Sequence, residues 1–113
     1  MIAAFLAAAL TVNVTPHVAF SPATIRARAQ LEQLPTARTL VIFLASAEFE
    51  QRSDIPIFPC GDTCKPTRTV WIPDWKSVPA DDYVVTVIVV DQAGTELARA
   101  IAAPVHIAAG LGQ

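Results

Sequence analysis

The aromatic residues Trp71, Trp75 and Phe58 offer the most direct route to binding chemistry in this sequence. The two tryptophans stand four residues apart in the segment RTVWIPDW, which has the composition of a β-strand. On one face of a strand, residues i and i+4 lie about 13 Å apart, so two coplanar rings could stack on a glycan. Three roles remain open for these rings: a carbohydrate platform, a protein-contact surface, or anchors of the hydrophobic core.

Cys60 and Cys64 lie in the segment PCGDTCKP, whose proline, glycine, aspartate and threonine residues mark a loop. A disulfide that closes this loop is expected if the protein is exported, and it would add little stability because a short loop removes little unfolded-chain entropy. The spacing is not the C-x-x-C of redox proteins, and no other cysteine or histidine lies near in sequence to complete a metal site. Free thiols are the main alternative.

His17 and His106 lie in segments that are expected to form the first and last strands, which are often neighbours in a sandwich. Two imidazoles without a nearby carboxylate or thiolate make a poor metal site. Calcium takes six or more oxygens, and paired aspartates such as Asp81 and Asp82 are common in turns because they bond to the local backbone. We therefore predict surface or edge-strand histidines, turn aspartates and no metal.

Sequence motifs of common enzymes are missing. The chain has no G-x-S-x-G, no H-E-x-x-H and no glycine-rich phosphate-binding loop. The expectation is a protein that is not an enzyme, with no catalytic residues and no cofactor.

The composition indicates one folded domain with few charges. Of the 113 residues, 53% are hydrophobic and 16% are charged, against about 25% charged in an average soluble protein. Such a chain either buries much of its surface or packs part of it on a partner. The net charge is −2, and the basic residues form no cluster longer than Arg26 and Arg28, which argues against nucleic-acid binding.

The chain begins with an apolar stretch at residues 2–10, far shorter than the roughly 20 residues that span a bilayer. Its length suits the hydrophobic region of a signal peptide, and residues 7–9 offer a cleavage site of small side chains, although the usual preceding positive charge is missing. The alternatives are a start at an internal methionine of a longer precursor, or an extension of the first strand. The signal-peptide interpretation predicts a secreted or periplasmic protein without a membrane span in its mature chain.

The first half of the chain contains segments with the sequence patterns of β-strands, followed by a loop. The segment ATIRARAQLE, residues 23–32, puts its apolar side chains on one face and its polar ones on the other, as in a half-buried strand. TLVIFLAS, residues 39–46, is apolar on both faces, as expected of a central strand covered on both sides. Residues 48–67 contain prolines and both cysteines and predict a short edge strand or two followed by a long loop.

The second half of the chain predicts further strands. Pro73 interrupts residues 68–75 and requires an edge position or a bulge, because proline donates no ladder hydrogen bond. YVVTVIVVD is the strongest strand, and the turn DQAG, in which Gly94 is free to adopt positive φ, leads to a returning strand that Pro104 interrupts. About seven strands and no convincing helix predict an all-β, antiparallel two-sheet sandwich.

The spacing Val78-Pro79-x-x-x-Tyr83, followed by alternating valines, resembles the corner between strands E and F of immunoglobulin-like and fibronectin type III-like domains in bacterial secreted proteins. The resemblance covers roughly residues 11–107 and implies an immunoglobulin-like sandwich. It implies that the Tyr83 ring fills core volume while its hydroxyl bonds to the backbone of the corner. The chain departs from antibody domains because it lacks their inter-sheet cysteine pair and the tryptophan of strand C.

This corner also implies a register for the preceding strand. Val78 points inward, Trp75 becomes a core anchor, and Trp71 shares its face. Val70 and Ile72 then face outward or against another layer. Apolar alternation alone does not choose between the registers, so a surface position for the tryptophans stays open.

The predicted organisation has three parts. Residues 1–10 are a signal-peptide remnant or a first-strand extension, 11–107 are the sandwich, and 108–113 are a flexible C-terminal tail. The predicted function is that of a non-catalytic extracellular or periplasmic module with a structural, adhesive or protein-interaction role. The alternative is a carbohydrate-binding module that uses surface tryptophans, so the expected partner is a protein or a polysaccharide.

Overall fold

The protein is all-β over the residues that the computed structural model describes, which are 10–32, 36–58 and 67–110. In these ranges the chain forms nine strands and no helix, and hence no helix that could cross a membrane. The strands are β1 (Leu10–Thr15), β2 (Val18–Phe20), β3 (Ala23–Glu32), β4 (Thr39–Ala45), β5 (Glu50–Pro56), β6 (Thr67–Val78), β7 (Asp81–Val90), β8 (Glu96–Ile101) and β9 (Val105–Ala108).

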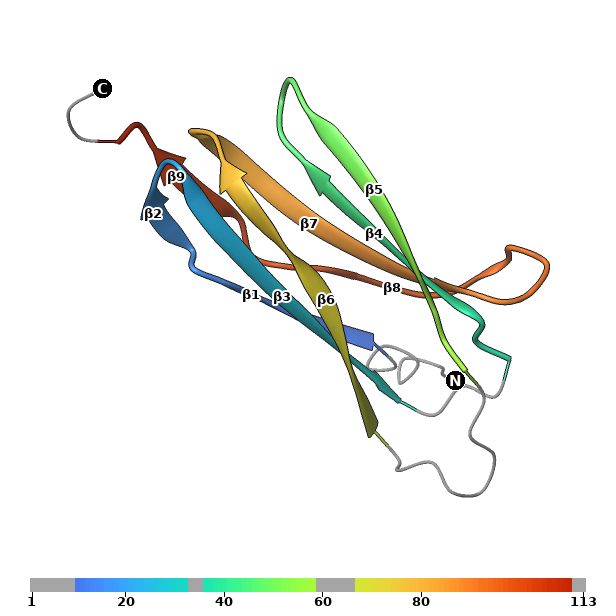
Figure 1. The fold of residues 1–113 in the computed structure, drawn as a ribbon. Coiled ribbons are helices and arrows are strands. Elements are labelled where there is room, and N and C mark those ends of the chain that lie inside the picture. The colour runs from blue at the N-terminus through green and yellow to red at the C-terminus, as the bar shows by residue number, and fades with distance from the viewer. Residues whose placement is uncertain (1–9, 33–35, 59–66, 111–113) are drawn as a thin grey trace, which may run out of the picture.

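The strands form two sheets that lie face to face (Figure 1). The smaller sheet has the order β1-β3-β6, and the larger has the order β2-β9-β7-β4-β5, with β8 also paired to β7. All pairs are antiparallel except β2 with β9, which run parallel. The prediction of an all-β chain arranged in two sheets is confirmed.

The described residues form nine strands where about seven were expected, because the first and last strands are each divided. After β1 the chain leaves the smaller sheet and joins the larger one as β2, which pairs with β9. β9 and β8 pair with successive parts of β7 and are separated by residues 102–104. Pro104 therefore lies between two strands rather than inside an edge strand.

β3 has the regular alternation that its sequence predicts. Every second side chain faces the core, and the side chains between them are exposed. β4 is a central strand of the larger sheet, between β5 and β7. Every second side chain of β4 and of β7 points across the core toward β3 in the opposite sheet. The inward residues of these two strands are Leu40, Ile42, Leu44, Tyr83, Val85, Val87 and Val89.

β6 follows a period of three instead of two. Its buried residues are Ile72, Trp75 and Val78, which pair with residues 27, 25 and 23 of β3. Each step of two residues on β3 thus opposes three on β6, the arrangement of a β-bulge. β6 is one of the two edge strands of its sheet, so the extra residues are accommodated toward solvent.

The bulges correct the expected register of Trp71. Trp75 and Val78 are buried as predicted, but Trp71 is 70% exposed, and Ile72 lies in the core where it was expected to face outward or against another layer. Val70 also packs against the core. The prediction put Trp71 on the same face as Trp75 four residues later, whereas the first bulge reverses the face between positions 72 and 75. Pro73 lies within that bulge, as its missing donor requires.

The corner before β7 has the contact that the resemblance implies. Tyr83 is only 1% exposed, and its hydroxyl donates a hydrogen bond to the Pro79 carbonyl oxygen at 2.8 Å. The edge of Phe49 meets the Tyr83 ring at a centroid distance of 6.4 Å and an interplanar angle of 82°. Burial, followed by the nearby Asp81 carboxylate, raises the pKa of the Tyr83 phenol. The ring therefore fills core volume while its polar atom is satisfied.

The turn between β7 and β8 is also as predicted. Gly94 has a φ of 87°, in the region that side-chain-bearing residues rarely adopt. The Asp91 carboxylate accepts hydrogen bonds from the backbone N–H groups of Ala93 and Thr95, each at 2.9 Å. These contacts direct β8 back along β7.

Candidate functional site

The three aromatic residues considered for ligand binding are in different environments. Trp75 is 7% exposed and belongs to the core, whereas Trp71 and Phe58 are 70% and 73% exposed. The two tryptophans therefore do not form one platform, because only Trp71 reaches the surface. Phe58 follows β5, and its carbonyl oxygen accepts a hydrogen bond from Arg68 at 2.8 Å.

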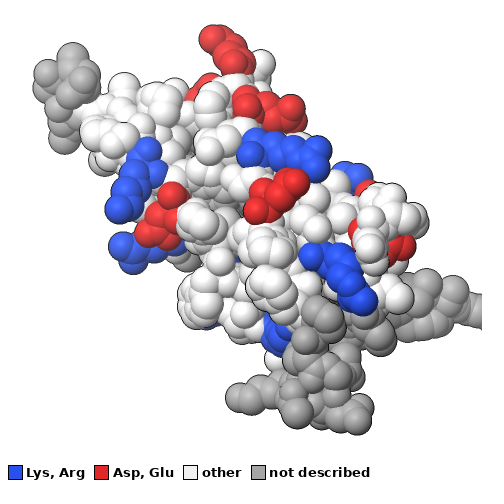
Figure 2. Space-filling model, turned by 45° about the vertical axis from the view of Figure 1, so that its right-hand side comes forward, with Lys and Arg blue, Asp and Glu red and all other residues white. Residues whose placement is uncertain are grey.

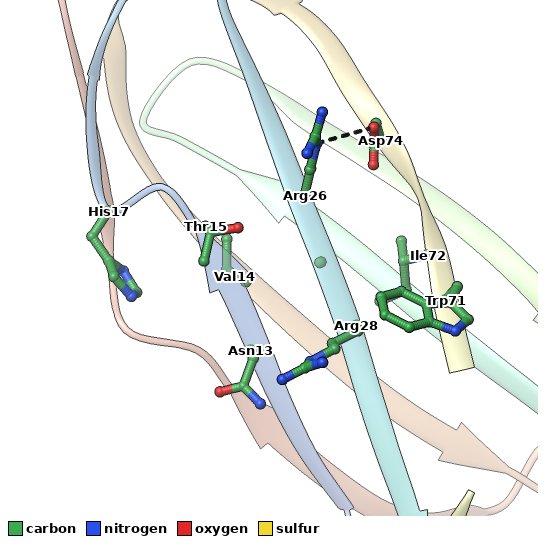
Figure 3. Close-up of a pocket in the computed structure, with 10 residues that line it drawn as sticks. Asn13, Val14, Thr15, His17, Arg26, Arg28, Trp71, Ile72 and Asp74 are labelled. Carbon is green, nitrogen blue, oxygen red and sulfur yellow. Dashed lines mark ion pairs between the residues drawn. The ribbon is translucent and has the colours of Figure 1, made fainter. Parts of the chain in front are cut away.

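A shallow groove surrounds Trp71 on the outer face of the smaller sheet, with a volume of about 400 Å³. Strand pairing places Asn13 of β1 opposite Arg28 of β3, and Arg28 opposite Trp71 of β6. These three outward side chains form one row across the sheet, in which Arg28 stands between the amide and the indole (Figure 3). In the next row, Thr15 pairs with Arg26.

The groove carries one arginine whose charge is not matched locally. Arg26 forms an ion pair with Asp74 at 3.5 Å, drawn as a dashed line in Figure 3. The Arg28 guanidinium instead lies over the Trp71 ring, 5.8 Å from its centroid, and it forms no ion pair with a carboxylate in the parts of the chain that the structure describes. The row of Asn13, Arg28 and Trp71 therefore combines an amide, a cation and an exposed aromatic face.

The outer face of the larger sheet has a different character. The residues that alternate with the inward side chains of β4 and β7 are mostly apolar. Val41 pairs with Ile88, and Phe43 pairs with Thr86, which in turn pairs with the 64% exposed Ile101 of β8. The apolar stripe, as we call this surface, consists of Val41, Phe43, Ala45, Val84, Ile88, Val90 and Ile101.

Charged pairs border the apolar stripe on both sides. On β5, Arg52 forms an ion pair with Asp54 at 3.0 Å and lies over the Phe43 ring, 5.8 Å from its centroid. On β8, Arg99 forms an ion pair with Glu96 at 2.8 Å. Hydrogen bonding to these partners raises the pKa of both arginines and lowers that of Glu96. Figure 2 shows how acidic and basic side chains alternate on a mostly uncharged surface.

Both histidines are exposed, as predicted, but the paired aspartates Asp81 and Asp82 begin strand β7 instead of forming a turn. The backbone N–H of His106 donates to the His17 carbonyl oxygen at 2.8 Å, so the first and last parts of the sandwich are neighbours as expected. The imidazole Nδ1 of His106 bonds to the carboxylate of Asp82, whose own N–H donates to the Asp81 side chain at 2.8 Å. In the three described ranges, no group of three or more acidic, histidine or cysteine residues is placed to hold a metal ion.

Two predictions concern segments outside the described residues. Cys60 and Cys64 belong to residues 59–66, so the disulfide stays a prediction. The apolar stretch at residues 2–10 is outside as well, except for Leu10, which begins β1. The interpretation as a signal peptide therefore also stays a prediction.

Sequence reasoning missed Asn13 and Arg28 as neighbours of Trp71, and it missed the apolar stripe. Arg28 was assigned correctly to the polar face of β3, but nothing in that strand alone says which strands lie beside it. The stripe had a signal in the doubly apolar segment at residues 39–46, which was interpreted as burial on both faces. Val41 is indeed only 5% exposed, although no second layer covers it among the described residues.

The fold and these surfaces define an all-β protein built from two packed sheets, with two distinct outer faces. Comparison of the sequence with models of known protein families and with curated proteins finds no match. The function is therefore argued from the surfaces themselves.

Proposed function

We propose that this chain is a non-catalytic, immunoglobulin-like module, exported to the periplasm or the cell exterior, that functions by self-association through the apolar stripe. Its immunoglobulin-like character is supported by the order β1-β3-β6 against β9-β7-β4-β5 and by the Tyr83 corner. A structural or adhesive role follows for a module that joins copies of itself.

The observation that carries this proposal is the arrangement of apolar centre and charged border on the larger sheet. Protein interfaces have this arrangement, with an apolar centre depleted in charge and a polar rim. Val41, Phe43 and Ile88 form the centre, and the ion pairs of Arg52 and Arg99 form the rim. The low charged fraction of 16% fits a chain that covers part of its surface with a partner.

A second copy is the occupant that the charges favour. In a two-fold symmetric interface the same surface meets itself, so it must be self-complementary. Each border of the apolar stripe carries both signs, Arg52 with Asp54 on β5 and Arg99 with Glu96 on β8. A copy turned by 180° therefore brings a border with both signs against another border with both signs, whichever border it meets.

Sedimentation equilibrium of the full chain over a range of concentrations tests this proposal. The expected result is a reversible dimer, which Ile101→Glu and Val84→Glu convert to a monomer because each buries a charge within the apolar stripe. Gln30→Glu adds the same charge to the outer face of the smaller sheet and should leave the dimer intact. A chain that stays monomeric at all concentrations, or a dimer that survives Ile101→Glu, would contradict the proposal.

Carbohydrate binding is the second candidate, and the exposed Trp71 is the specific observation in its favour. The carbohydrate-binding hypothesis that the sequence suggested required two coplanar tryptophans, and the burial of Trp75 removes one of them. A single exposed ring needs additional polar contacts to hold a sugar, and the groove has such side chains.

A further inference from the structure

We propose that the groove around Trp71 binds an acidic sugar, a pyranose ring that carries a carboxylate, as one unit of a polysaccharide. The site consists of Trp71, Arg28 and Asn13, aligned across three neighbouring strands. It lies on the sheet opposite to the apolar stripe, so it is independent of self-association and remains open in the proposed dimer.

The indole of Trp71 supplies the stacking surface. One face of a pyranose ring presents C–H groups, which pack on the flat, electron-rich face of an aromatic ring while the sugar hydroxyls remain solvated. Trp71 lies on a strand and is 70% exposed, so its ring is open to solvent. Its groove of about 400 Å³ lies within the range of about 300 to 1,000 Å³ of small-molecule sites.

Arg28 supplies the charge selectivity. A guanidinium binds a carboxylate through two parallel N–H donors, and this geometry favours an acid over a neutral group. Asp74 offsets the charge of Arg26 in the adjacent row, whereas Arg28 has no acidic partner among the described residues. An anion at the edge of the Trp71 ring therefore meets one available cation.

Asn13 completes the row with a side chain that both donates and accepts hydrogen bonds, as adjacent sugar hydroxyls require. Single-stranded nucleic acid also combines a stacking base with an anion, but it needs a track of cations along its backbone. The groove has one unmatched arginine, and the whole chain has a net charge of −2. These charges favour an isolated carboxylate over a polyphosphate.

Isothermal titration calorimetry with oligogalacturonate, a chain of uronic-acid units, tests the site on the full chain. The control ligand is the same oligomer with every carboxylate methyl-esterified, which keeps the ring and removes the charge. We expect the acidic oligomer to bind at least about tenfold more tightly than the ester. It should also quench the fluorescence of Trp71, while the buried Trp75 stays unaffected.

Substitutions separate the two parts of the site. Trp71→Ala should abolish binding of both oligomers, and Arg28→Gln should remove the roughly tenfold preference for the acid. Lys76→Gln is the matched control, because it removes one exposed positive charge from β6 outside the residues that line the groove, and it should bind like the parent chain. Absence of binding, equal binding of acid and ester, an unchanged Arg28→Gln variant, or tighter binding of an oligothymidylate would each overturn the proposal.

Discussion

β3 and β6 are neighbours in the same sheet, yet they distribute their side chains by different rules. β3 has neighbours on both sides, β1 and β6, and its side chains alternate strictly between core and solvent over ten residues. β6 has a neighbour on one side only, and its inward residues recur at every third position from Ile72 to Val78. A strand paired on both sides has to keep the register of two ladders, whereas an edge strand keeps only one.

This difference decides the roles of the two tryptophans. Without bulges, Trp71 and Trp75 would share a face, since four residues are two full periods of a strand. The bulge between Ile72 and Trp75 adds one residue, so Trp75 enters the core and Trp71 stays in solvent. A single added residue therefore separates a buried tryptophan from an exposed one.

The largest expected effect comes from removing the inward tryptophan. Trp75→Ala should lower the free energy of unfolding by about 3 to 5 kcal/mol, because it leaves a cavity opposite Ile25 in the core. Urea denaturation followed by circular dichroism measures the change. A loss below about 1 kcal/mol would mean that the β6 register is not the one described and that β3 and β6 do not differ in this way.

The next effect concerns the corner that ends β6. Tyr83→Phe removes the hydroxyl that bonds to the Pro79 carbonyl and should lower the free energy of unfolding by about 1 to 2 kcal/mol, since the ring volume is kept and only the hydrogen bond is lost. Urea denaturation is again the measurement. An unchanged midpoint would show that the corner contact contributes nothing.

The pH dependence of stability provides a second test of Tyr83. Burial raises the pKa of its phenol above the ordinary value of 10.0, so the folded state holds the proton more tightly than the unfolded state. The resulting stabilisation is fully present below pH 10.0 and is lost as the pH rises through the raised pKa. Because Tyr83 is the only tyrosine, the ultraviolet absorbance of phenolate reports its ionisation alone, and Tyr83→Phe should lack this alkaline loss.

Local sequence patterns were sufficient for the strands with regular alternation. The polar and apolar residues of β3 repeat every two positions, so the buried face follows directly. The turn at Gly94 was predictable because it depends on residues that are close in sequence, and the bond of Tyr83 to the backbone of its corner was implied by the resemblance to immunoglobulin-like domains. These features need no knowledge of which strands are paired.

Features that depend on pairing were not predictable in this way. Trp71 was placed inward because a bulge is a mismatch between two strands, and the sequence of β6 alone contains only the hint of Pro73. The row of Asn13, Arg28 and Trp71 joins residues from three strands, and its existence depends on two registers at once. Candidate sites built from several strands are therefore the part of such a protein that is hardest to predict from its sequence.

A smaller effect is expected at the second bulge of β6. Ser77 has a φ of 56°, in the left-handed region that β-branched residues adopt only with strain. Ser77→Val should lower the free energy of unfolding by about 1 kcal/mol relative to Lys76→Val, which places the same side chain one residue earlier. Equal midpoints for the two variants in urea would mean that the second bulge imposes no such constraint, and that β6 differs from β3 only at its first bulge.

The smallest expected change in stability comes from the outward tryptophan. Trp71→Ala should alter the free energy of unfolding by less than about 0.5 kcal/mol, because the ring is 70% exposed and leaves no cavity. It should also remove the fluorescence that iodide quenches, since the remaining Trp75 is 7% exposed. A loss as large as that of Trp75→Ala would make Trp71 a structural residue and remove the contrast on which the sugar site rests. A small loss, together with the loss of quenching, is the outcome expected of an exposed ring that does not support the fold and is free to contact a ligand.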